Sequence, residues 1–253
     1  MLSWTALITE PAMLALVGIA FVTALVRGFS GFGAGMLFMP LAGALFDPKL
    51  AIVMIWMIDS VPAFPILFPA LKKCVWREIV PMAIAAFVGV PIGMYLLKTA
   101  DPVPVRWTIS LLTLVLAAIL WSGWRYRVRP NMPTTLGVGF SSGFLGGFAA
   151  IPGPPVLMFW MSGPASAAVA RANIIAYFGI LMVLSGANLF AQGFITMESL
   201  QRSLILAPVY LAGVLIGNRM FGFASEATFR RIAYALIIVF ALLGLPVLDS
   251  VLG

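Results

Sequence analysis

The sequence predicts an all-α integral membrane protein built from two inverted repeats, and three observations support this fold class. Hydrophobic residues make up 62% and charged residues 9% of the 253-residue chain, against about 45–50% and about 25% in soluble domains. The apolar residues form long runs, near the roughly 20 residues that a helix needs to cross a bilayer. Short motifs also recur between the two halves. A chain with so little polar surface cannot coat a water-soluble globule, so we expect lipid around it.

Ten apolar segments lie between charged or Pro/Gly-rich breaks, five in each half. We predict them at 11–28, 34–46, 50–71, 79–97, 105–124, 134–151, 154–165, 167–192, 203–222 and 231–248. The first run follows Glu10 without a basic region, so we expect it to be retained as a span. Each second segment is short and each first segment is interrupted by glycine, so these pairs are either full spans or re-entrant hairpins. The count is therefore eight to ten transmembrane helices.

An internal repeat relates residues 1–124 to residues 125–253. The motif Gly89-Val-Pro-Ile-Gly93 and the motif Gly213-Val-Leu-Ile-Gly217 lie 124 positions apart, and Arg106 and Arg230 follow them at the same spacing. The motif at 29–32 also resembles that at 141–144. Two halves with the same order of segments are typical of transporter folds with internal repeats.

Basic residues in the short loops predict the orientation of the segments, because such loops stay in the cytoplasm. Three loops are placed inside in this way, by Lys72, Lys73 and Arg77, by Arg125, Arg127 and Arg129, and by Arg219, Arg230 and Arg231. The loop at 193–202 falls outside, whereas its counterpart at 72–77 falls inside. The repeats are therefore predicted to be inverted, with both termini outside, as in a multi-pass protein of a bacterial-type inner membrane.

Two glycine-rich segments interrupt the first helix of each half. Broken helices inside a membrane expose backbone N–H groups and the positive end of the helix dipole, which attract anions. We therefore predict a midplane site for a small anion between the two breaks. Glycines spaced by four residues also let membrane helices pack closely, and we favour packing for the pairs at 89/93 and 213/217. The residues predicted to contact the solute are Arg27, Ser30, Gly31, Gly33, Gly35, Ser142, Gly143, Gly146, Gly147, Arg171 and Asn173.

Asp59 is an acidic residue well inside an apolar run. An ionisable group at that depth is costly and by default marks a functional site, so we predict that Asp59 couples a proton or cation to transport. The alternative is an acid neutralised by a structural partner. For Arg171 two interpretations stay open, a ligand of the anion or an anchor that sets topology.

Composition also excludes several classes of function. The chain has no histidine and one cysteine, so no cofactor, metal or haem site is expected and an enzyme is disfavoured. The net charge of +7 reflects loop residues that set topology and predicts no nucleic-acid partner.

The glycines at 31–35 lack the strand that a nucleotide loop requires, and no Walker motif supports an ATP-driven pump. The expected partners are a small anion, lipid and a coupling ion. A membrane-embedded enzyme and a passive channel remain as alternatives, and nothing indicates an oligomeric state.

The two glycine-rich segments and the short charged loops resemble the sulfite exporter TauE/SafE family over nearly the whole chain. The matching residues are Gly28, Ser30, Gly31, Gly33, Gly35 and Pro40 in the first half, and Gly139, Ser142, Gly143, Gly146, Gly147 and Pro154 in the second. The resemblance implies a permease for sulfite or small organosulfonates. The cluster at 152–155 departs from the symmetry of the first half.

Overall fold

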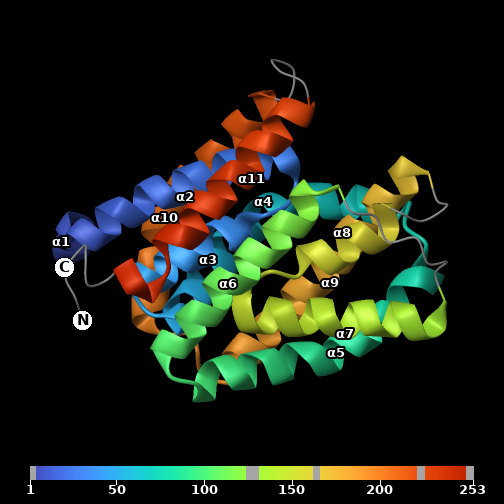
Figure 1. Cartoon of the computed structure of the whole chain (residues 1–253), viewed down its shortest axis with the longest axis horizontal. Helices are drawn as coiled ribbons and strands as arrows, with labels where there is room; N and C mark the ends of the chain where they lie inside the picture. Colours follow the sequence, from blue (N-terminus) through green and yellow to red (C-terminus); the bar gives the residue numbers. More distant parts are fainter. Residues whose placement is uncertain (1–3, 124–130, 162–165, 221–225, 249–253) are drawn as a thin grey trace. The chain divides into compact units, whose positions relative to one another are not determined.

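A computed structural model describes residues 4–123, 131–161, 166–220 and 226–248. These residues form α-helices joined by short connections, with one 3-10 turn and no strand among them (Figure 1). The helices are α1 (Trp4–Thr9), α2 (Pro11–Ser30), α3 (Ala34–Leu45), α4 (Pro48–Leu71), α5 (Trp76–Thr99), α6 (Pro102–Trp121), α7 (Met132–Ala149), α8 (Gly153–Met161), α9 (Ala167–Ala191), α10 (Met197–Met220) and α11 (Glu226–Leu243).

Each of the ten predicted segments coincides with one helix, so the all-α fold class is confirmed. The predicted start of the ninth segment, at 203, is six positions later than Met197, where α10 begins. The helix starts earlier because its charged residues pair: Arg202 forms ion pairs with Glu198, one turn before it, and with Glu10 at the start of α2. Arg125, Arg127, Arg129 and the side chain of Arg230 lie outside the described residues.

Six of the described helices are long and apolar enough to cross a membrane: α2, α4, α5, α6, α9 and α10. The helices after the two breaks are much shorter, with 12 residues in α3 and 9 in α8. At 1.5 Å per residue they span about 18 and about 14 Å, against roughly 30 Å of hydrocarbon. Neither short helix can therefore cross the membrane by itself.

The chain divides into two compact units that do not follow the boundary between residues 124 and 125. Unit 1 contains 1–59, 100–122 and 193–253, and unit 2 contains 60–99 and 123–192. Each unit therefore takes helices from both halves of the sequence, and α4 contributes to both.

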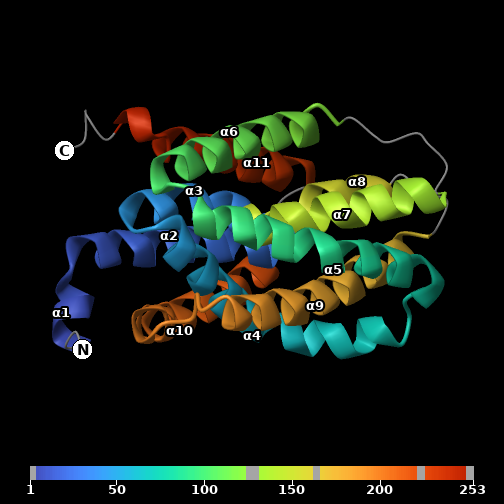
Figure 2. The same ribbon diagram turned by 90° about the horizontal axis from the view of Figure 1, so that it is seen from below.

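Within unit 2, α5 and α7 run side by side, as the two views in Figures 1 and 2 show. Glycines make this close approach possible, because a methyl group at Gly139, Gly143 or Gly147 of α7 would overlap backbone atoms of α5. Gly89 and Gly93 of α5 face the backbone of α7 in the same way. The predicted packing role of this pair is confirmed.

Within unit 1, α2 and α10 form the corresponding pair. A methyl group at Gly28 of α2 would overlap the carbonyl group of Val214, and one at Gly217 of α10 would overlap that of Leu25. One at Gly213 would come within 2.6 Å of an α2 side chain. In both units the first helix of one half thus packs through glycines on the fourth helix of the other half. The inverted orientation of the halves stays a prediction.

Candidate functional site

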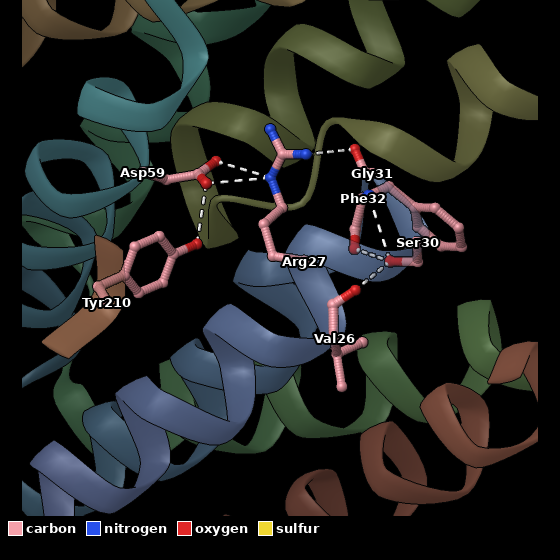
Figure 3. Close-up of polar contacts among 7 residues, drawn as sticks. All are labelled: Val26, Arg27, Ser30, Gly31, Phe32, Asp59 and Tyr210. Carbon is pink, nitrogen blue, oxygen red and sulfur yellow. Dashed lines mark hydrogen bonds and ion pairs between the residues drawn. The ribbon is translucent and has the colours of Figure 1, made fainter. Parts of the chain in front are cut away.

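The first break lies in unit 1, between α2 and α3. The helix α2 ends at Ser30 and is capped by Gly31, whose φ of 76° is left-handed and whose N–H donates to the carbonyl of Arg27 at 2.9 Å. Gly33, with a φ of 89°, is the residue before α3. Glycine adopts this conformation without the steric cost that other residues incur. Two such residues in three positions separate α2 from α3, and Figure 3 shows Ser30, Gly31 and Phe32 of this turn near Arg27.

The helix α3 begins without a side-chain cap. Its cap position is Gly33, which has no side chain to accept from the first N–H groups, and a helix leaves four such groups without a partner inside the helix. In the part of the chain that the structure describes, the backbone N–H groups of residues 33–36 have no protein acceptor. Ala34 and Met36 are nevertheless buried, 6% and 1% exposed. Buried N–H groups need an acceptor, and the positive helix end favours an anionic one.

Arg27 lies one turn before Gly31 and pairs with Asp59 of α4 (Figure 3). Its Nε lies 3.0 and 3.3 Å from the two carboxylate oxygens of Asp59, and its Nη1 donates to the carbonyl of Gly31. The hydroxyl of Tyr210, on α10, donates to Asp59 Oδ1 at 2.8 Å. The Arg27 and Asp59 side chains keep 16% and 28% of their surface exposed. A partly exposed charged pair therefore lies beside the start of α3.

Ser30 shapes the turn of the first break through its hydroxyl. The Oγ lies 2.7 Å from the carbonyl oxygens of Val26 and Phe32 and accepts from the N–H of Phe32 at 3.3 Å. One hydroxyl hydrogen can serve only one of these carbonyls at a time. The predicted role of Ser30 as a solute ligand stays a prediction, and its hydrogen is already used by the backbone.

The second break lies in unit 2, between α7 and α8, and has different chemistry. The left-handed residue here is Ala150, with a φ of 55°. The Ser142 hydroxyl donates to the carbonyl of Pro152 at 2.8 Å. Proline has no N–H, so Pro154 and Pro155 remove two donors from the first turn of α8. The start of α8 therefore offers far fewer free amides than the start of α3.

Other predicted site residues of unit 2 have structural partners or face outward. Asn173 is fully buried, accepts from the N–H of Val75 at 2.7 Å and donates to Glu78 at 2.9 Å. The indole of Trp160 donates to the same Glu78 oxygen at 3.1 Å. Arg171 is exposed. Asn173 thus ties α9 to the start of α5.

The structure brings together one group of the predicted residues. Unit 1 holds Arg27, Ser30, Gly31, Gly33, Gly35 and Asp59; unit 2 holds Ser142, Gly143, Gly146, Gly147, Arg171 and Asn173. Close packing on α5 accounts for glycine at 143 and 147, and Gly146 faces Pro152. Their part in solute binding stays a prediction.

Sequence reasoning missed Tyr210 and the contacts of Glu78. The signal for Tyr210 is its position deep in the 203–222 apolar run. Within the described ranges, no three Asp, Glu, Cys or His side chains gather to hold a metal ion.

Comparison with known proteins adds independent evidence. A family model described as "Sulfite exporter TauE/SafE" matches residues 16–243 of the chain. A "Probable sulfite/organosulfonate exporter TauE" of Cupriavidus necator is 26% identical over 235 residues, which cover 87% of this chain and 89% of that protein. A "Probable inner membrane transporter protein TsaS" of Comamonas testosteroni is 28% identical over 172 residues, 64% of this chain and 69% of that protein. No solved structure matches.

Proposed function

The chain belongs to the sulfite exporter TauE/SafE family, and we propose that it carries a small anion, sulfite or a small organosulfonate, by alternating access. The predicted resemblance to this family is confirmed, and the chain is a multi-pass membrane protein of a transporter family. One relative is named for sulfite and organosulfonate export and another for transport across an inner membrane. These names support the choice of solute.

The observation that carries the proposal is the start of α3 beside Arg27, where the N–H groups of residues 33–36 have no acceptor among the described residues. An anion sheds its water inside a membrane only if protein donors replace the lost hydrogen bonds. The four amides at 33–36 and the guanidinium of Arg27 are donors of this kind, and charged donors bind oxyanions more strongly than neutral ones. A sulfonate group presents three oxygens to such donors. A site dominated by neutral amides also permits release, which a carrier needs.

The proposal includes coupling to an ion gradient through Asp59. The chain has no Walker motif, so the free energy for accumulation has to come from an ion or from the solute itself. Asp59 is the acidic residue in contact with Arg27, which makes it our candidate for binding the coupling proton or cation.

Transport by the purified full-length protein in sealed vesicles tests the proposal. Labelled sulfite and methanesulfonate should enter in a saturable manner, and solute preloaded inside should accelerate the entry of label from outside. Arg27→Gln should lose this activity, because it removes the charged donor, while thermal melting checks that the variant is folded. Entry without saturation or acceleration by preloaded solute would identify a channel, and conversion of sulfite to another product would identify an enzyme. Failure of the wild type to bind or move any small anion in a broad panel would overturn the proposal.

A further inference from the structure

We propose that Arg27 serves Asp59 and the solute in turn, so that each anion is carried together with one proton. In the state described here the carboxylate of Asp59 holds the guanidinium. When the anion binds, Asp59 takes up a proton and gives up this partner. The inference rests on the proposed function, because it concerns how an anion binds at the first break.

The geometry of the guanidinium leaves room for such an exchange. Arginine carries five N–H donors in a fixed fork. Asp59 occupies the Nε donor with both of its oxygens, and Nη1 reaches the Gly31 carbonyl. Among the described residues Nη2 has no acceptor. A guanidinium has two edges with parallel N–H groups, and Nη1 of one edge already donates to the Gly31 carbonyl. An oxyanion bound by two parallel N–H groups is therefore expected at the other edge, formed by Nε and Nη2. That edge includes the donor that Asp59 now holds, so the two anions compete for it.

Charge balance determines what accompanies the anion. Arg27 and Asp59 together are neutral. A monovalent anion added to this pair would leave one net negative charge within a membrane span, and uncompensated charge is costly there. A proton on the Asp59 carboxylate restores neutrality. A hydronium ion from the aqueous side where the solute enters gives up one O–H bond and leaves water, and an O–H bond forms on the carboxylate. The freed N–H group of Arg27 then donates to the solute. On release the same steps run backwards.

Tyr210 keeps the carboxyl group in place during the exchange. It is fully buried and donates to Asp59 Oδ1 at 2.8 Å, so Asp59 retains one partner when it leaves Arg27. Within the described residues, Arg27 of α2 and Tyr210 of α10 are the titratable groups that contact Asp59. The Asp59 side chain keeps 28% of its surface exposed, so the surrounding protein does not seal it off completely. We therefore assign Tyr210 as a positioning residue.

Binding of methanesulfonate to the full-length protein in lipid nanodiscs tests the exchange. Methanesulfonate does not titrate in the neutral or mildly acidic range, so any proton taken up on binding belongs to the protein. The wild type should take up one proton for each anion bound, measured with an indicator dye in weak buffer. By linkage its affinity should rise as pH falls, by up to about tenfold per pH unit.

Variants distinguish the exchange of Arg27 between Asp59 and the solute from electrostatic attraction of the solute by Arg27 alone. Asp59→Asn removes the negative charge that competes for Arg27 and leaves at most a neutral hydrogen bond. Methanesulfonate should therefore bind roughly tenfold more tightly at neutral pH, without proton uptake and without pH dependence. Asp101→Asn makes the same chemical change at an exposed residue before α6 that forms no cap bond, and it should behave as the wild type. Tyr210→Phe should shift the pH profile of affinity to higher pH, because the phenol donates to the ionised carboxylate.

Each outcome bears on a different statement. Binding by the wild type without proton uptake would overturn the exchange, and this measurement does not depend on any variant being folded. Unchanged affinity in a folded Asp59→Asn protein would overturn it too. If the wild type binds neither methanesulfonate nor any other small anion of the panel used for transport, the proposed function fails and the exchange fails with it.

Discussion

The two helix breaks share a backbone plan but differ in polar chemistry. In each, a long helix ends in a left-handed residue and a helix of half length follows. The first break has glycine at both special positions, free amides at the start of α3 and a charged pair beside them. The second break has alanine at its left-handed position, prolines in place of amides, and a serine hydroxyl bonded across the turn. The two breaks thus resemble each other in backbone and differ in the hydrogen-bond donors that they offer.

The N-terminal ends of α5 and α10, the fourth segments of the two halves, also differ in their polar chemistry. Glu78 and Arg202 lie 124 positions apart, the offset of the repeat. Glu78 accepts from Trp160 and Asn173. Arg202 pairs with two carboxylates and lies 4.4 Å from the ring centroid of Phe46. Two positions that the predicted repeat would pair therefore carry opposite charge and have different partners.

The largest effect on stability is expected at the glycines through which α2 and α7, the helices before the two breaks, pack on their neighbours. Gly28→Ala and Gly139→Ala each place a methyl group on a carbonyl of the facing helix, and each should lower the free energy of unfolding by about 1–3 kcal/mol. Gly18 and Gly137 have open space around them. Alanine there should be neutral or stabilise by up to about 1 kcal/mol through helix propensity. Thermal melting in detergent measures all four. If only one of Gly28→Ala and Gly139→Ala lowered the stability, the two helix pairs would not depend on their glycines in the same way.

The next effect, on the affinity for the solute, is expected at the helix starts where the two breaks differ. Gly35→Pro copies the arrangement of Gly153 and Pro154 into the start of α3 and removes an amide that has no protein acceptor. Affinity for methanesulfonate should fall about tenfold, the loss of roughly one hydrogen bond to an anion. Pro154→Ala adds an amide at the second break and should leave affinity unchanged. If the two substitutions affect affinity equally in folded proteins, the solute does not discriminate between the breaks.

A smaller effect is expected at the serine of the second break. Ser142→Ala removes the hydrogen bond to Pro152 and should lower the free energy of unfolding by about 1 kcal/mol. Affinity for methanesulfonate should not change, because the hydroxyl hydrogen is already used. Chemical or thermal unfolding together with a binding isotherm checks both statements. A loss of affinity without loss of stability would return Ser142 to the solute site.

The last prediction concerns topology and requires no change in stability. Cys74, the one cysteine of the chain, lies in a loop predicted to face inside. A membrane-impermeant maleimide should therefore label it in inside-out vesicles and not in intact cells. Burial raises the pKa of the Cys74 thiol, so labelling should be slow at neutral pH and faster as pH rises.

The matching loop of the second half gives the control. Met197→Cys, introduced with Cys74→Ser, places the cysteine at an exposed position at the start of α10. It should be labelled in intact cells, because the repeats are predicted to be inverted. Labelling of both cysteines from the same side would rule out the inversion.

The sequence predicts helices far better than it predicts contacts. All ten segments follow from runs of apolar residues, because a bilayer imposes its own length on them. Arg27 and Asp59 both stand out as charges near or inside apolar runs. Their pairing does not follow from the sequence, because 32 positions separate them, and Tyr210 lies 151 positions from Asp59. Such partners depend on how the helices pack.

Glycine spacing is ambiguous for a related reason. The spacing of Gly139 and Gly143 suits both helix packing and a backbone opened for a ligand, and only the position of α5 shows that a methyl group would not fit there. The N–H groups at the start of α3 lack an acceptor because the helix begins after the left-handed Gly33. A run of alternating glycines suggests a left-handed residue but does not show which glycine adopts that conformation.

The interleaving of the two halves has a consequence for how the protein is made. Every helix of unit 2 has been synthesised once the ribosome reaches residue 192, whereas unit 1 also needs residues 193–253. Its helix α2 enters the membrane early and meets α10 only near the end of translation. Domains generally assemble as their chain emerges, so unit 2, whose segments lie in the middle of the sequence, should be complete before unit 1. Until then the face of α2 that contains Gly28 lacks α10 as its packing partner, so we expect the insertion machinery or a chaperone to shield α2 during this interval.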